Sequence, residues 1–341
     1  MPLLSLSDLL VPEALELHSF TPPKRFQNTH FRDYIPQDDS QATAVAGVQA
    51  FVAEAVQIPE RPKRRWFRKA VQLEGRGLYL DGGFGVGKTH LLASAYNALD
   101  ISPREKAYLS FQELVYVIGV LKKEGAAQHF APYRFICIDE FELDDSGNTL
   151  LVKSFLARVF PNNCYVMTTS NTVPTSQGKG RFNAEDFKRE IQSIADSFEV
   201  LSVGGPDYRQ RSQLASLLSS EEVQRILSRY ASYESKRCLK LGFEEFIAYL
   251  ASLHPIRYGR VLEQTNALVV TDLQTIRDQN AALRFVHFID KLYDMNIAFA
   301  ATGAICLSEL FDESYRDGAY TKKYYRCLSR LSELLEEISA E

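Results

Sequence analysis

Apolar residues follow two alternating patterns along the first two thirds of the chain. Short continuous apolar runs, of the kind found in strands buried on both faces, are separated by segments in which apolar residues recur every three or four positions, as on one face of a helix. Strands are predicted at 77–80, 107–109, 135–138, 164–171 and 198–203, and helices at 41–52, from 88 and from 111. This alternation predicts an α/β fold, with a parallel sheet covered by helices on both faces.

The last third of the chain has a different pattern. From Ser219, which opens a Ser-x-x-Glu capping box, most apolar residues follow helical spacing. Three stripes stand out: Phe243, Phe246, Ile247 and Leu250; Phe285, Phe288, Ile289 and Leu292; and Leu328, Leu331, Leu334 and Leu335. Such stripes are typical of a hydrophobic core and not of a cofactor site, so we expect a helical C-terminal region.

A glycine-rich segment lies between the first predicted strand and the helix after it. Gly82 to Thr89 fits the pattern G-x-x-x-x-G-K-[ST], in which a tight turn brings backbone N–H groups toward the oxygens of a triphosphate. Lys88 would neutralise the β- and γ-phosphates, and the Thr89 hydroxyl is a ligand for Mg²⁺. The predicted cofactors are therefore ATP and Mg²⁺. The predicted nucleotide-binding residues are Gly82, Gly83, Phe84, Gly85, Val86, Gly87, Lys88, Thr89 and His90.

Two other predicted strands end in polar residues that suit this chemistry. The run 135–138 leads into Asp139 and Glu140, the Walker B pattern, in which Asp139 would hold Mg²⁺ and Glu140 would polarise the attacking water. The strand at 164–171 ends in Asn171, which resembles the polar sensor that orients the lytic water in AAA-type ATPases. The alternative for Asn171 is an ordinary turn asparagine. Ligands bind at the carboxyl ends of strands in open α/β sheets, so we expect these groups to lie there.

Composition narrows the class of protein. The length of 341 residues suggests about two domains, and 45% hydrophobic with 24% charged residues is ordinary for a soluble globular chain. A formal net charge of −4 argues against a general attraction to nucleic acid or to an anionic membrane. The five cysteines are scattered and form neither a zinc spacing nor a disulfide framework. With neither a secretory signal nor an apolar run of the ~20 residues that span a bilayer, we expect a cytoplasmic protein.

Residues 61–69 carry six basic side chains around Trp66 and Phe67. One interpretation is a solvated segment that leads into the first core strand. We favour it, because short charge runs are usually solvated. The other is a patch for a phosphate backbone or an acidic partner. The second interpretation would suit an ATPase linked to nucleic acid.

The motifs and their order resemble the ZapE-type AAA ATPases, which are bacterial division-associated proteins and their mitochondrial relatives. The resemblance covers most of the chain, and its most diagnostic parts lie late in the sequence. It rests on the segments 34–41, 78–82, 139–141, 169–171, 207–209, 284–294 and 326–331. The resemblance implies a role in cell division, with an effect on the tubulin-like division ring, and an ATP-dependent homo-oligomer in which a neighbour supplies an arginine.

The resemblance also implies two functional arginines and leaves a choice for each. The stretch after Asn171 departs from the family pattern, so the arginine that acts across a subunit boundary is Arg181 or Arg189. We favour Arg181, because it follows a flexible glycine-containing segment. The lid arginine that senses the γ-phosphate is Arg326 or Arg330, which share one helical face, and we favour Arg326.

Together these features predict a P-loop NTPase of the AAA type, with a three-layer parallel-sheet core and a C-terminal helical lid region. The expected divisions are 1–59 for an N-terminal arm and first helix, 60–215 for the ATPase core and 216–341 for the lid region. The predicted function is Mg²⁺-dependent ATP hydrolysis coupled to remodelling of a protein partner. The alternatives are a nucleic-acid-linked ATPase, such as a helicase loader or transposition helper, and a nucleotide-gated scaffold, against which the intact Glu140 argues.

Overall fold

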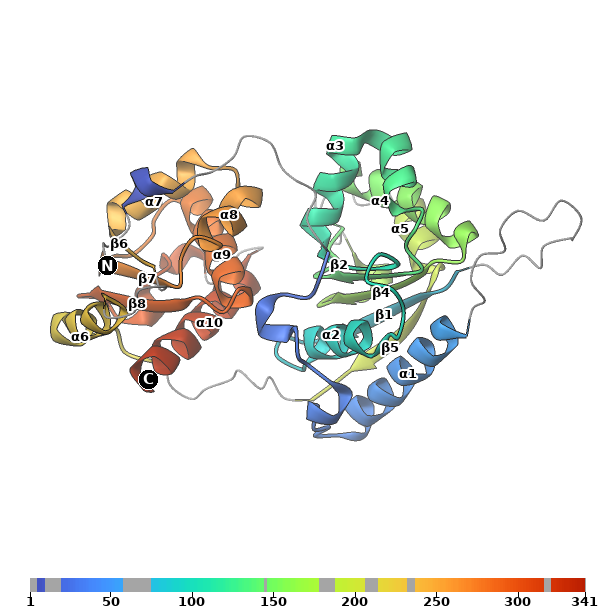
Figure 1. Cartoon of the computed structure of the whole chain (residues 1–341), viewed down its shortest axis with the longest axis horizontal. Coiled ribbons are helices and arrows are strands. Elements are labelled where there is room, and N and C mark those ends of the chain that lie inside the picture. The colour runs from blue at the N-terminus through green and yellow to red at the C-terminus, as the bar shows by residue number, and fades with distance from the viewer. Residues whose placement is uncertain are drawn as a thin grey trace, which may run out of the picture. The chain divides into compact units, whose positions relative to one another are not determined.

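In the computed structural model, the chain forms two compact units (Figure 1). The residues that it describes are 5–9, 20–57, 75–143, 146–177, 188–205, 214–231, 237–315 and 320–340. Of these, 20–22 and 26–205 belong to what we call the N-terminal unit. Residues 5–9, 23–25 and 214–340 belong to the C-terminal unit. Among the described residues, no helix has both the length and the apolar character needed to cross a membrane.

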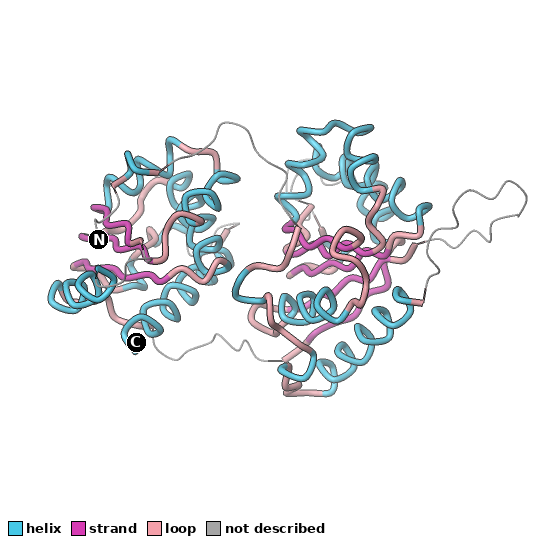
Figure 2. Tube along the Cα trace, viewed as in Figure 1, coloured by secondary structure: helices cyan, strands magenta, loops and turns pink. Residues whose placement is uncertain are grey.

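The N-terminal unit is built on a five-stranded sheet (Figure 2). All its strands are parallel, in the order β2-β3-β4-β1-β5. The strands are β1 (Gly77–Gly82), β2 (Lys106–Ser110), β3 (Phe135–Asp139), β4 (Tyr165–Ser170) and β5 (Phe198–Val203). Each of the five lies where the apolar runs predicted it. The strand that ends before Asn171, β4, lies between β1 and β3, as the sensor interpretation requires.

Helices cover both faces of this sheet. Side chains alternate between the faces of a strand, so Leu78 and Leu80 enter one core with α1 and α2, whereas Tyr79 enters another with α3, α4 and α5. Figure 1 shows these two groups of helices on opposite sides of the strands. The helices are α1 (Asp39–Val56), α2 (Lys88–Ala98), α3 (Phe111–Phe130), α4 (Ser146–Val159) and α5 (Lys188–Ala195). This arrangement confirms the predicted three-layer core.

The C-terminal unit is mostly helical, as predicted, but it contains a sheet that the sequence analysis did not predict. Three parallel strands lie in the order β6-β7-β8. They are β6 (Cys238–Gly242), β7 (Ala267–Leu273) and β8 (Ala298–Gly303). The helices are α6 (Ser220–Ala231), α7 (Phe243–Ser252), α8 (Tyr258–Leu262), α9 (Gln279–Asp294) and α10 (Thr321–Ala340). The three predicted apolar stripes lie on α7, α9 and α10 and pack together around this sheet.

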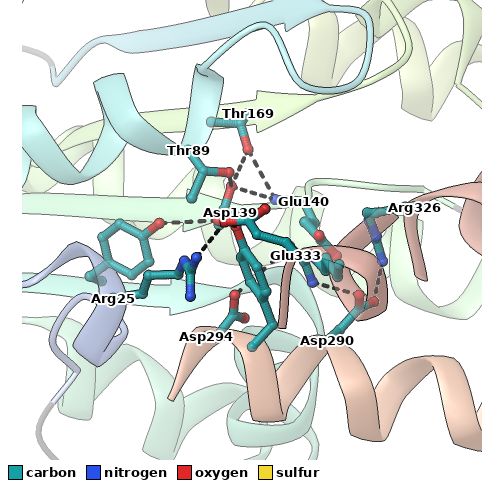
Figure 3. Close-up of polar contacts among 12 residues, drawn as sticks. Arg25, Thr89, Asp139, Glu140, Thr169, Asp290, Asp294, Arg326 and Glu333 are labelled. Carbon is teal, nitrogen blue, oxygen red and sulfur yellow. Dashed lines mark hydrogen bonds and ion pairs between the residues drawn. The ribbon is translucent and has the colours of Figure 1, made fainter. Parts of the chain in front are cut away.

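Two segments near the start of the chain belong to different units. The first helix, α1, packs into the core of the N-terminal unit, where Val48 and Phe51 are buried. Arg25 belongs to the C-terminal unit, where it pairs with Glu333 and lies 4.0 Å from the centre of the Tyr293 ring (Figure 3). Later in the chain, the described residues up to 205 belong to the N-terminal unit and those from 214 onward to the C-terminal unit.

Candidate active site

The predicted phosphate-binding loop follows β1 and leads directly into α2. Gly85 and Gly87 have φ angles of 67° and 88°, in the left-handed region that favours glycine. A side chain at Gly87 would also place its Cβ 2.4 Å from the ring of Tyr34. The loop therefore needs glycine at this position for two reasons, backbone conformation and space.

Tyr34 covers the loop from the segment that precedes α1. Its hydroxyl donates a hydrogen bond to the Val86 carbonyl at 2.8 Å, and its ring meets the ring of His90 edge to face, with 5.5 Å between the centroids. The backbone carbonyl of His30 lies 3.2 Å from Nε2 of His90. Burial lowers the pKa of His90. Residues 30–34 thus fix one side of the loop.

Lys88 is buried at the start of α2, with 8% of its surface exposed. Its ammonium group donates to the carbonyls of Gly82 and Gly83 and to Oδ1 of Asn171, the last at 2.9 Å. The predicted sensor and the predicted phosphate-binding lysine therefore lie in direct contact. A buried ammonium group at the carboxyl end of parallel strands suits an anionic ligand.

Asp139 lies at the end of β3 and accepts hydrogen bonds from three hydroxyl groups (Figure 3). Thr89 Oγ1 donates to Asp139 Oδ1 at 3.2 Å, Thr169 donates to the same oxygen, and the Tyr108 hydroxyl donates to Oδ2 at 3.1 Å. Burial and the nearby charge of Glu140 raise the pKa of Asp139, and the three hydroxyl hydrogen bonds oppose that rise. The carboxylate is therefore held in one orientation next to the loop.

These residues fit Mg²⁺. A hydroxyl and a carboxylate oxygen 3.2 Å apart can both contact one small hard cation, and both are ligand types that Mg²⁺ prefers. Proteins usually bind Mg²⁺ through one or two such groups together with phosphate oxygens and water. Thr89 and Asp139 are the residues that would hold it.

Glu140 has a backbone conformation that is uncommon for a residue with a side chain. Its φ is 55°, and its N–H donates to Asp139 Oδ1 at 3.1 Å and to Thr169 Oγ1 at 3.0 Å. Such residues cost on the order of 1–3 kcal/mol and persist where the surroundings fix them, often at functional sites. The turn directs the chain away from β3 immediately after Asp139.

The structure describes three of the four predicted arginines. Arg181 lies outside the described residues, as do the basic run at 61–69 and the segment 207–209. Arg189 lies in the first turn of α5 and is exposed. Arg326 and Arg330 lie on α10 of the C-terminal unit, both buried, and both donate to Asp290 of α9 (Figure 3). The sequence analysis did not predict this carboxylate partner.

The fold also brings to the site residues that the sequence did not single out. Thr169 belongs to a polar ending of β4 from which only Asn171 was selected, so its signal was present. Tyr108 reads as an ordinary apolar strand residue, and nothing in its local sequence indicates its bond to Asp139. Tyr34 was noted only as part of a family resemblance. Its contact with the loop depends on how residues far apart in the chain pack together.

The sequence of this chain matches one family model and several known proteins. A model of the AFG1-like ATPase family matches residues 20–241 and 220–340. The cell division protein ZapE of Escherichia coli (strain K12) is 23% identical over 369 aligned residues, which cover 94% of this chain and 97% of that protein. An uncharacterized protein of Schizosaccharomyces pombe is 20% identical over 94% of this chain and 84% of its own length.

The likeness to solved structures is more distant. The replication initiator DnaA bound to AMPPCP and single-stranded DNA has a TM-score of 0.41 and 12% identity, over 91% of this chain and 92% of that one. The DnaC helicase loader has a TM-score of 0.37 and 19% identity, over 53% of this chain and 99% of that one. Neither likeness is close enough to bear on function.

Proposed function

This chain belongs to the AFG1-like ATPase family, and we propose that it couples Mg²⁺-dependent hydrolysis of ATP to the remodelling of a protein partner. The family makes the chain a nucleotide-binding ATPase, which confirms that prediction from the sequence. The Mg²⁺ requirement, the partner and the role of each site residue are parts of the proposal.

One observation carries the proposal. The loop lysine, the loop threonine, both Walker B acids and Asn171 come from three separate segments and lie together at the carboxyl edge of the sheet. This is where open α/β sheets bind ligands. The five residues are the parts that phosphoryl transfer to water needs: Lys88, Thr89, Asp139, Glu140 and Asn171.

Each residue has a distinct part in the proposed reaction. Lys88 exchanges its hydrogen bonds to the loop carbonyls and to Asn171 for phosphate oxygens, which frees the Asn171 amide to orient water. Glu140 accepts a proton from that water as the water attacks. Asp139 and Thr89 hold Mg²⁺, which when bound neutralises charge that develops on the phosphates.

The proposed partner is a protein. The Escherichia coli relative is named as a cell division protein, which supports a role in cell division, and the family resemblance suggests the tubulin-like division ring as the target. The proposed active form is a homo-oligomer in which Arg181 or Arg189 of one subunit stabilises the transition state in the next. From the family resemblance we also propose Arg326, with Arg330 as the alternative, as the arginine that senses the γ-phosphate.

The first prediction separates binding from turnover at this site. Lys88→Ala should abolish ATP binding, because the triphosphate loses its buried cation. Glu140→Gln should still bind ATP but lose turnover by ~10²-fold or more, because the amide keeps the shape and cannot take a proton. Calorimetry with a non-hydrolysable ATP analogue and a phosphate-release assay, each with and without Mg²⁺, measure the two steps.

Glu124→Gln is the matched control, since Glu124 is an exposed carboxylate on α3 that pairs with Arg158. It should change neither step by more than about twofold. Turnover near the wild-type rate in Glu140→Gln would show that Glu140 is not the catalytic carboxylate. Capture of a protein by Glu140→Gln with ATP, in the native cell, supports the remodelling proposal. Salt-dependent binding to DNA instead would favour the nucleic-acid-linked alternative.

A further inference from the structure

Gln177 is a buried polar residue that the reaction described above does not use. It follows the short helix Pro174–Ser176, and 5% of its surface is exposed. Its side chain reaches residues on, or directly after, the three neighbouring strands β1, β4 and β3. The amide nitrogen Nε2 lies 2.8 Å from the Tyr79 hydroxyl, 3.0 Å from Ser170 Oγ, 3.1 Å from the Phe141 carbonyl and 3.3 Å from the Thr172 carbonyl. The amide oxygen accepts from the backbone N–H of Leu143 at 3.0 Å.

The chemistry of these partners fixes the orientation of the amide. The N–H of Leu143 can only donate, so it must face the amide oxygen. The carbonyls of Phe141 and Thr172 can only accept, so they must face the NH₂ group. A side chain therefore needs both a donor and an acceptor at its end to satisfy this position, and glutamine supplies both.

One side of this network holds the residues directly after Glu140. The Phe141 N–H donates to the Thr169 carbonyl at 2.7 Å, and the Phe141 carbonyl accepts from Gln177. Leu143 also bonds to Gln177. A left-handed residue such as Glu140 keeps its conformation only while the chain on both sides is fixed. β3 fixes the chain before Glu140, and Gln177 fixes the chain after it.

The other side of the network holds the residues that flank Asn171. Ser170 and Thr172 both lie within hydrogen-bond distance of Gln177 Nε2. The Tyr79 hydroxyl also donates to the Thr172 carbonyl at 2.7 Å. Burial raises the pKa of Tyr79, so its hydroxyl keeps its proton at working pH. One amide thus joins the Walker B turn to the turn that carries the sensor.

We propose that Gln177 is a positioning residue for ATP hydrolysis. It holds the Glu140 carboxylate and the Asn171 amide at fixed positions relative to each other. This inference rests on the roles proposed above for Glu140 and Asn171. Gln177 acts through them. The two groups must reach the same water, so a small shift of either lowers the rate of the chemical step and leaves nucleotide binding to the loop intact.

Gln177→Met tests the inference, because methionine keeps the length of the side chain and removes its hydrogen bonds. We expect kcat of the full chain to fall about tenfold to a hundredfold, while the Kd for a non-hydrolysable ATP analogue stays within about threefold of wild type. Tyr79→Phe is a milder second variant that keeps the ring in the core and removes the hydroxyl. It should lower kcat in the same direction by a smaller factor.

Gln192→Met is the matched control, since Gln192 lies on α5 of the same unit and its exposed side chain donates to Asp196. It should leave kcat unchanged. Wild-type kcat in both the folded Gln177→Met and Tyr79→Phe proteins overturns the inference, as does an equal loss of kcat and affinity. Glu140→Gln measured alongside separates two failures. If that variant is inactive while the Gln177 and Tyr79 variants turn over normally, only this inference fails, and if it is active the proposed reaction fails.

Discussion

Asp290 lies between two arginines of the neighbouring helix. It accepts hydrogen bonds from Arg326 and Arg330, and Asp294 lies 3.8 Å from a second nitrogen of Arg330. Burial alone would raise the pKa of Asp290, but the charges of Arg326 and Arg330 outweigh burial and lower the pKa to about 2. Removing one member of a buried ion pair typically costs ~3–5 kcal/mol, because it leaves a buried charge without its partner.

The low pKa predicts how the C-terminal unit responds to acid. The folded pKa of Asp290 lies below its ordinary value of 3.8, so the ionised carboxylate stabilises the fold above that value. This stabilisation is lost as the pH falls toward about 2. Hydrogen exchange of α9 and α10, corrected for intrinsic rates, should show protection that decreases over this interval. Asp290→Asn should be less protected at neutral pH and should lack the loss of protection that is specific to Asp290.

Arg326 and Arg330 each have a structural role and a candidate sensing role, and variants of the two residues can separate these roles. The prediction from the sequence remains that Arg326→Ala weakens the preference for ATP over ADP more than Arg330→Ala does. Because both guanidinium groups bond to Asp290, we expect both variants to lose stability as well. Binding of ATP and ADP analogues by calorimetry, with thermal unfolding measured in parallel, checks this. A larger nucleotide effect in Arg330→Ala would move the sensing role to that residue.

At the scale of single elements, the start of α3 follows its local sequence, whereas its interruption depends on packing. Its start was predicted: the Ser110 N–H donates to Glu113 Oε2 at 2.8 Å, and the Glu113 N–H donates to Ser110 Oγ at 3.2 Å. Its interruption was not. Lys122 has φ 56° and ψ 175°, a region that is essentially reserved for glycine. Residues on both sides of the interruption, Ile118 and Ala126, are buried in the same core.

This strain gives a prediction for a surface residue. Lys122→Gly should stabilise the N-terminal unit by about 1 kcal/mol, because glycine adopts this conformation without strain. Lys123→Gly removes the same charge at the next exposed position, which is helical, and should destabilise by about 1 kcal/mol. Hydrogen exchange of α3 peptides at increasing urea concentration measures both. Equal effects in the two variants would contradict a strained Lys122.

At the scale of the whole molecule, the proposed arginine contact between subunits requires assembly. Hydrolysis per subunit should then rise with protein concentration, since an arginine supplied by a neighbour can be worth ~10³ or more in rate. The test mixes two inactive variants, Lys88→Ala and Arg181→Ala. In a mixed assembly, a Lys88→Ala subunit can supply its intact Arg181 to the intact loop of its neighbour, so activity should recover. A monomer whose rate is independent of concentration, with no recovery on mixing, would contradict a shared site.

Arg189→Ala, mixed with Lys88→Ala in the same way, decides between the two candidate arginines. Arg189 is exposed on α5, so its replacement should have little effect on folding. If Arg181 acts across the boundary, Arg189→Ala alone should remain active. If Arg189→Ala is inactive and recovers on mixing while Arg181→Ala is active, the role belongs to Arg189.

The sequence by itself determined the strands of the N-terminal unit and selected the residues of the candidate site. The apolar runs placed all five strands of the N-terminal unit, and the P-loop and Walker B patterns selected Lys88, Thr89, Asp139 and Glu140. The strand predictions are confirmed because burial on two faces gives an apolar run. The site residues could be selected because a phosphate-binding turn needs its glycines in order. In the C-terminal unit the strands were missed although 267–270 and 298–301 are continuous apolar runs, because the helical stripes around them dominated the pattern.

Only the tertiary structure decided which distant residues meet. Thr169 and Tyr108 reach Asp139, Tyr34 covers the loop, and Gln177 joins two turns, yet none of these contacts has a sequence pattern of its own. The same holds for the buried pairing of both α10 arginines with Asp290. Hydrogen bonds between segments far apart in the chain depend on strand order and helix packing, which a single sequence records only through the combined preferences of all its residues.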